Sequence, residues 1–271
     1  MNGAQTIGLS RIAPQSLTRL ILDRVVKQTL TVLLTTTAAL VLCHVMAALV
    51  NNIYPSDATA VLRDFFGLER EGSVTTWFSS LQLALIGLTC GGLFISERLR
   101  SVSVAHAVGW LALAVVFLFL SLDEAAQVHE RFDQVLSMYS RQLGVATVTA
   151  ITTDHVFIQD VGLAAYSYML VYVPVFVGVL YLSRRFIAGR GASRATQALW
   201  VAGFLGFAVK LGMEPFEAWL WQTVWLGHNV MVEVVIIQMA ALLVGEALIL
   251  TAVLGHLVGQ VRPSVGLSHV A

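Results

Sequence analysis

The sequence has little charge. Only 12% of its 271 residues are Asp, Glu, Lys or Arg, whereas a soluble domain has about 25%. The 16 basic and 16 acidic residues balance, so no excess of positive charge indicates a nucleic-acid partner. This composition excludes an ordinary soluble globular domain.

Cysteine is also scarce. Cys43 and Cys90 lie inside apolar runs, and their spacing matches no cysteine metal motif. Because the predicted topology places them at different depths of a membrane, we expect no disulfide. Residues 1–27 are polar and lack the short apolar region of a signal peptide. We therefore expect the first span to be the membrane anchor.

Long apolar segments take the place of charge. Hydrophobic residues make up 57% of the chain, and its mean hydropathy is +0.79. A membrane-spanning helix needs about 20 apolar residues. Six segments qualify: 29–50, 74–95, 104–122, 161–182, 196–213 and 228–254. We therefore predict an all-α polytopic bundle of six transmembrane helices within residues 28–257.

Basic residues set the predicted orientation, because Lys and Arg concentrate in cytoplasmic loops. They dominate the tail 1–27, the loop 183–197 and the tail 258–271. The segments 51–73 and 123–160 carry acids as well and are predicted to lie outside. The charge pattern thus predicts a multi-pass membrane protein with both termini in the cytoplasm.

The first outer loop shows a helix pattern of its own. Ser56 is a suitable N-cap. Val61, Leu62 and Phe65 recur on one side of the segment that follows, as in an amphipathic helix. We predict an interfacial helix near 56–68.

Ionisable side chains gather near the outer ends of the predicted spans. The stretch "FLSLDEAAQVHE", residues 119–130, closes the third span with Asp123, Glu124, His129 and Glu130. Other polar residues at the same depth are His44, Ser79, Ser80, Lys210, Glu214, His228 and Glu233. Ionisable groups in membrane spans are costly and mark functional sites. The inner half has fewer of them, with Glu246 as the main exception.

The helix phase divides the acids of the third span. At about 100° per residue, Asp123, His129 and Glu130 share one third of the helix surface. Glu124 points to another side, together with Arg131. We expect this helix to continue past the membrane surface into an extended outer segment, 123–160.

Carboxylates combined with imidazoles are typical ligands of zinc and iron. We therefore predict a divalent transition-metal site, zinc or iron, and its ligands are Asp123, His129, Glu130, His228 and Glu233. Asp123, Glu130 and Glu233 are the predicted catalytic residues. The spacing of these residues lacks the Glu-x-x-His of carboxylate helix bundles. The residue types therefore indicate metal binding, but the spacing does not define the class of metal protein.

Several of these residues also have a purely structural interpretation. Lys210 and Glu214 are four residues apart and can neutralise each other. Pro215 disfavours helical geometry at the residue before it, so a break is expected there. Ser79 and Ser80 are small hydroxyl residues of the kind that packs helices together.

Four stretches together resemble a known group. They are "TTWFSSLQLAL", "FLFLSLDEAAQVHERF", "GMEPFEAW" and "VMVEVVIIQMAALLVGEALIL". They resemble a broad, uncharacterised group of bacterial multi-pass membrane proteins with an "LDE…HE" stretch on the third span. The resemblance covers about residues 70–250, and it implies an architecture and marked positions rather than a reaction. The matching residues are Asp123, Glu124, His129, Glu130, Glu214 and Glu233. Val232 and Gln238 depart, because the group tends to be acidic there.

A looser similarity connects the chain with intramembrane hydrolases of the alkaline-ceramidase type. Those proteins combine a Ser, an Asp and several His near one membrane face. The corresponding residues here are Ser79 or Ser80, Asp123, His129 and His228. Their late His-x-x-x-His is missing, because Val232 stands four residues after His228.

Three functions are compatible with these patterns. The favoured hypothesis is a metal-dependent membrane enzyme, a hydrolase or oxidoreductase, whose outward-facing site acts on a lipid-like or membrane-soluble substrate. A second hypothesis is a non-catalytic integral subunit that docks a membrane protein partner through its outer loops. The third is a proton-coupled transporter, which the sparse polar groups of the inner half disfavour. The lipid bilayer is a partner in every case.

Overall fold

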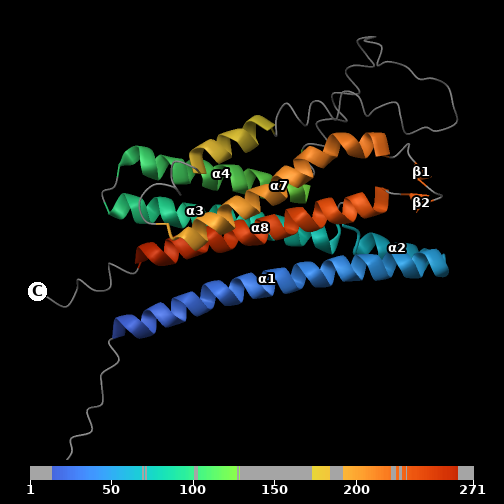
Figure 1. The fold of residues 1–271 in the computed structure, drawn as a ribbon, viewed down its shortest axis with the longest axis horizontal. Helices are drawn as coiled ribbons and strands as arrows, with labels where there is room; N and C mark the ends of the chain where they lie inside the picture. Colours follow the sequence, from blue (N-terminus) through green and yellow to red (C-terminus); the bar gives the residue numbers. More distant parts are fainter. Residues whose placement is uncertain are drawn as a thin grey trace, which may run out of the picture.

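Long apolar helices form most of this molecule (Figure 1). The computed structural model describes residues 14–68, 70, 72–100, 103–126, 128, 173–183, 192–220, 224–225, 228–229 and 231–261. Side chains are described in the first helix from Asp23, in the helix that starts at Arg194 up to Met213, and in the last helix from Val234 to Gln260.

The long helices are α1 (Pro14–Ile53), α3 (Val74–Leu99), α4 (Val104–Ala126), α7 (Arg194–Leu220) and α8 (Met231–Val261). Each contains a stretch that is long and apolar enough to cross a membrane. The shorter elements are α2 (Asp57–Phe65), the helix Val173–Ser183 and an antiparallel ribbon of β1 (Val224–Trp225) and β2 (His228–Asn229). The chain is therefore an all-α, multi-pass membrane protein, as its composition predicts.

The helices alternate in direction along the bundle (Figure 1). α1 begins and α8 ends at one end, here called the terminal end; α4 ends and α8 begins at the other, the loop end. α4 and α7 both run toward the loop end, so the chain must return between them. The helix Val173–Ser183 is the described part of that return. It overlaps the predicted span 161–182, whose first part lies outside the described residues.

Several predicted boundaries differ from the observed ones. α1 begins at Pro14, within the segment predicted as a polar tail, and α8 continues to Val261. The break predicted before Pro215 is wrong, because α7 runs through to Leu220. A proline ring fixes φ near the helical value and removes one hydrogen bond, which a long helix tolerates.

Hydroxyl side chains cap the start of α2, of α3 and, through Ser193, of α7. Ser56 caps α2, and its side chain and that of Thr59 form a reciprocal capping box. This helix corresponds to the one expected near 56–68; its position at a membrane interface remains a prediction. Ser73 caps α3 in the same way by accepting a hydrogen bond from the backbone N–H of Thr76. These caps satisfy backbone groups that the first turn of a helix leaves unpaired.

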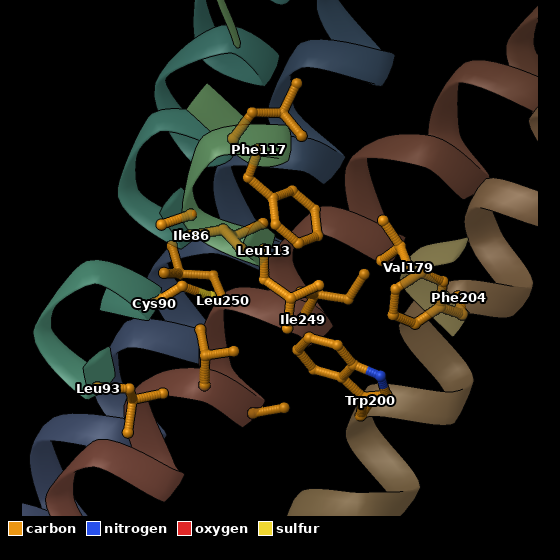
Figure 2. Close-up of a cluster of buried hydrophobic side chains, with 14 of the residues drawn as sticks. Ile86, Cys90, Leu93, Leu113, Phe117, Val179, Trp200, Phe204, Ile249 and Leu250 are labelled. Carbon is orange, nitrogen blue, oxygen red and sulfur yellow. The ribbon is translucent and has the colours of Figure 1, made fainter. Parts of the chain in front are cut away.

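α8 is the most deeply buried of the apolar spans. It packs against α1, α3 and α7, while α4 packs against α3. Figure 2 shows one core cluster that these helices share: Cys90 of α3, Leu113 and Phe117 of α4, Trp200 of α7 and Leu250 of α8 belong to it. α8 is thus the element around which the described helices are arranged.

α7 and α8 approach each other at the level of the backbone. A Cβ atom on Gly203 would lie 2.7 Å from the carbonyl oxygen of Gly245, and one on Gly206 would collide with the Ala241 carbonyl. Small residues allow this close approach of membrane helices. This contact fixes the rotation of α8 against α7. It therefore also fixes the direction of Glu246, which follows Gly245 in α8.

Candidate functional site: a carboxyl-lined cavity

Glu246 is the most deeply buried acid in the described part of the chain, with a relative exposure of 0%. It lies near the middle of α8, and two side chains of α3 donate hydrogen bonds to it. Ser79 Oγ donates to Oε1 over 2.7 Å, and Gln82 Nε2 donates to Oε2 over 3.3 Å. Ser79 and Gln82 are three residues apart and therefore share one face of α3. Both carboxyl oxygens are thus held by α3.

A cavity of about 110 Å³ lies beside Glu246. It is partly open, and α3, α4, the helix Val173–Ser183, α7 and α8 all contribute to its walls. Its ionisable lining residues are Asp123, Glu124, Lys210 and Glu246. Its apolar lining residues are Leu83, Phe117, Leu120, Val175, Phe176, Val179, Phe204, Phe207, Leu211 and Leu242. Buried ionisable groups that converge on an apolar cavity are the usual signature of a binding site.

Phenylalanine rings dominate the apolar wall. The Phe176 and Phe204 ring centroids are 5.7 Å apart, and those of Phe204 and Phe207 are 6.2 Å apart. Phe117 faces the same region from α4, and Val179 lies next to Phe204 (Figure 2). Rings at these separations stabilise one another. The wall is therefore an ordered aromatic surface rather than a loose apolar gap.

The structure places Asp123 at the cavity, with 4% relative exposure. Its neighbour Glu124 lines the same cavity, although the helix phase predicted that it points to another side. Consecutive helical residues diverge by about 100°, but a cavity that lies between two such directions is reached by both side chains. The structure thus brings Asp123 and Glu124 to one cavity, whereas their predicted directions alone suggested no shared site.

The other predicted ligands cannot be placed as side chains. His129 and Glu130 lie outside the described residues, and only the backbone is described for Glu214, His228 and Glu233. His228 belongs to β2 and is opposite Trp225. Within the described residues, no group of three or more His, Cys, Asp or Glu could hold a metal ion. The metal site thus stays a prediction, with Asp123 as its described member.

Sequence reasoning missed Glu246 as the centre of the site. The available signal was its isolation, because it is the main ionisable residue in the inner half of the predicted spans. A second signal was the i, i+3 spacing of Ser79 and Gln82 on an otherwise apolar helix. The structure assigns the two predicted packing serines differently. Ser79 contacts Glu246, whereas Ser80 Oγ donates to the Ser121 carbonyl over 2.9 Å.

A second polar cluster joins α3 and α8 at the terminal end. Gln260 Nε2 donates to the Glu97 carboxyl and lies 3.2 Å from His256 Nε2. Arg100 donates to the backbone carbonyl of Gln260. The His256 ring lies against Trp110, with centroids 5.4 Å apart. This cluster, called the terminal cluster below, ties the last turns of α3 and α8 together.

Apolar spans that enclose a cavity with buried carboxyl groups define the chain as a polytopic membrane protein with an intramembrane polar site. The chain belongs to the family described as "Domain of unknown function (DUF8692)", whose model matches residues 30–258. No curated protein and no solved structure matches the chain. The matched segment contains Ser79, Gln82, Asp123, Lys210 and Glu246.

Proposed function

We propose that the chain is a six-span protein of the bacterial inner membrane, with both termini in the cytoplasm. The directions of α4 and α7 support the sixth span, since the chain has to return between them. Arg98, Arg100 and Arg194 lie at or near the terminal end, and basic residues favour the cytoplasmic side. The loop end would then face outward.

We further propose that the cavity binds a lipid-like, membrane-soluble molecule as the substrate of a membrane enzyme. The single observation that carries this proposal is the mixed lining of the cavity. Phenylalanine and aliphatic side chains line it together with three carboxyl groups and Lys210. An amphiphile would place its apolar part against the apolar side chains and its polar group against the ionisable ones.

The chemistry that these residues supply is proton transfer. Asp123, Glu124 and Glu246 can each give or take a proton at a bound polar group, as general acids and bases do. Lys210 can hold an electronegative atom of that group through its ammonium. Ser79 and Gln82 fix the orientation of the Glu246 carboxyl. The cavity size favours a polar head group with a short apolar segment, because a cavity of about 150 Å³ holds benzene.

A metal-dependent version of this proposal uses the ligands that the sequence predicts, histidines included. His129, Glu130, His228 and Glu233 would join Asp123 at the loop end, and a bound zinc or iron ion would polarise a substrate bond there. Glu233 precedes Glu246 on α8 by about 20 Å of helix length. A metal bound by Glu233 would therefore sit well beyond Glu246.

Photolabelling tests the binding proposal. The probe is a long-chain alcohol with a diazirine, added to purified protein in lipid nanodiscs, with labelled peptides identified by mass spectrometry. We expect label on α4, α7 and the helix Val173–Ser183. Val175→Trp should block it, because Val175 lines the cavity. Val177→Trp is the matched control, since Val177 on the same helix is 56% exposed.

Equal labelling of the two tryptophan variants would overturn the binding proposal and favour a non-catalytic subunit. The metal-dependent version has a separate test by elemental analysis of the same preparation. We expect about one zinc or iron per chain and its loss in His129→Ala, because removing a ligand weakens metal binding. A metal content that His129→Ala leaves unchanged would remove the metal but not the cavity.

A further inference from the structure

We infer that the polar group bound in the cavity is an organic cation, and that its binding displaces a proton from Glu246. This inference rests on the proposed function, because it names the class of molecule that the same cavity takes. It is carried by the charges of the lining, the aromatic rings that line the same cavity and the hydrogen bonds around Glu246.

The charges of the wall favour a cation. Among the described lining residues, the carboxyl groups of Asp123, Glu124 and Glu246 stand against one ammonium, that of Lys210. With all four ionised, the wall would carry a net charge of two negative units. Such an excess is costly inside apolar spans. Protons or a bound cation can neutralise it, and the two compete for the same carboxyl oxygens.

The aromatic lining suits an organic cation better than a bare metal ion. Phe117, Phe176, Phe204 and Phe207 line the cavity, and the faces of aromatic rings attract alkylammonium groups. Hard metal ions prefer a shell of oxygen ligands, which these rings cannot supply.

The hydrogen bonds of Glu246 fit both of its protonation states. In the structure, Gln82 Nε2 donates a hydrogen bond to Glu246 Oε2. Among the described residues, Gln82 Oε1 has no hydrogen-bond partner, although Gln82 is only 1% exposed. A half-turn of the amide brings Oε1 to face Glu246. A protonated Glu246 would then donate its O–H to that oxygen, whereas the ionised carboxylate accepts from Nε2. The orientation of such an amide follows from the network around it.

The exchange step balances as follows: the cation enters, the O–H bond of the Glu246 carboxyl breaks, and the proton leaves to bulk solvent. The carboxylate that remains pairs with the cation. The titratable groups that line the cavity together with Glu246 are Asp123 and Glu124 of α4 and Lys210 of α7. α3 contributes the neutral donors Ser79 and Gln82. α1, which also packs against α8, contains the buried His44. By linkage, the affinity for the cation must rise with pH.

Two isosteric probes test the inference. Choline carries a permanent positive charge on its nitrogen and has no ammonium proton to release, while 3,3-dimethylbutan-1-ol has the same shape with carbon in place of nitrogen. Each competes with the diazirine alcohol for labelling in nanodiscs, and a pH-sensitive dye in weak buffer records protons. We expect the cation to compete at a concentration about tenfold lower and to release up to about one proton per molecule bound.

Glutamine variants of Glu246 and Glu97, the two buried glutamates at the contact between α3 and α8, complete the test. Glu246→Gln should abolish proton release and lower the cation affinity about tenfold, while labelling by the neutral alcohol persists and reports folding. Glu97→Gln, in the terminal cluster, should leave both readouts unchanged. Equal competition by the two isosteres, or proton release that survives in Glu246→Gln, would overturn the inference while the labelling pattern still supports the cavity. If the alcohol labels no cavity residue in the wild type, the proposed function itself fails.

Discussion

The contact between α3 and α8 contains two polar clusters that use similar side chains in different roles. In each, a glutamine amide donates to a buried glutamate on the other helix: Gln82 to Glu246, and Gln260 to Glu97. Gln82 and Glu97 are about 22 Å apart along α3, and Glu246 and Gln260 about 21 Å apart along α8. The clusters are therefore in register along one parallel pair of helices.

Their surroundings differ. Glu97 lies in the last turn of α3, beside Arg100, His256 and the end of α8. Glu246 lies in the middle of an apolar helix and adjoins a cavity. A carboxyl group at a helix end is easily neutralised or solvated, whereas one in mid-span is costly to keep. The comparison teaches that the position of a cluster along the helices, rather than its residue types, decides its role. A cluster at a helix end joins two helices, whereas one in mid-span beside a cavity is available to a ligand.

The largest effect is expected where α7 and α8 touch. Gly206→Leu forces a side chain into the Ala241 carbonyl, so the helices must separate beside Glu246. We expect a loss of about 3 kcal/mol in the free energy of unfolding, at the upper end of the usual cost of overpacking, measured by SDS titration. Gly91→Leu is the control, because nothing lies within 4 Å of a Cβ there. Similar losses in both variants would show that the close contact is not decisive.

The adjacent serines of α3 give the next largest contrast. Ser79→Ala leaves a buried oxygen of the Glu246 carboxyl without its donor, at a cost of about 1–3 kcal/mol. Ser80→Ala removes only the hydroxyl contacts with Ser121, worth about 0.6 kcal/mol between membrane helices. The two variants should differ both in their stability against SDS and in photolabelling of the cavity. Indistinguishable variants would argue against a special role for Ser79.

A smaller effect is expected at the terminal cluster. Glu97→Gln keeps an oxygen that can accept from Gln260 Nε2, so the joint between α3 and α8 survives. We expect a loss of about 0.6 kcal/mol and unchanged photolabelling of the cavity. A large loss of labelling would contradict the separation of the two clusters, because it would couple the terminal cluster to the cavity.

The smallest effect is expected at the exposed charges of the α2 region, which provide a baseline for the buried clusters. Asp64 pairs with Arg70 over 2.8 Å and with Arg63 over 3.2 Å, and the arginine side chains are largely exposed. Asp64→Asn should cost no more than about 0.5 kcal/mol, and less at high salt. A salt-independent loss above about 1 kcal/mol would show a role that these exposed pairs do not explain.

Part of the site could be predicted and part could not. Asp123 and Lys210 stand out in the sequence because ionisable residues in apolar segments are rare, and both line the cavity. Glu246 stands out for the same reason but lies far along the chain from its partners. Its bonds to Ser79 and Gln82 span more than 160 residues, and no local periodicity reports such a contact.

The sequence by itself determined that this protein crosses a membrane through apolar helices, because length and hydropathy within one segment suffice for that. It also determined the cap of α2, since Ser56 and Thr59 are local partners. Only the tertiary structure decided that Glu124 shares a cavity with Asp123, and that Glu246 is held by α3. Those placements depend on how helices rotate and approach one another. Here the backbone contact between Gly206 of α7 and α8 settles that rotation, and no single helix carries this information.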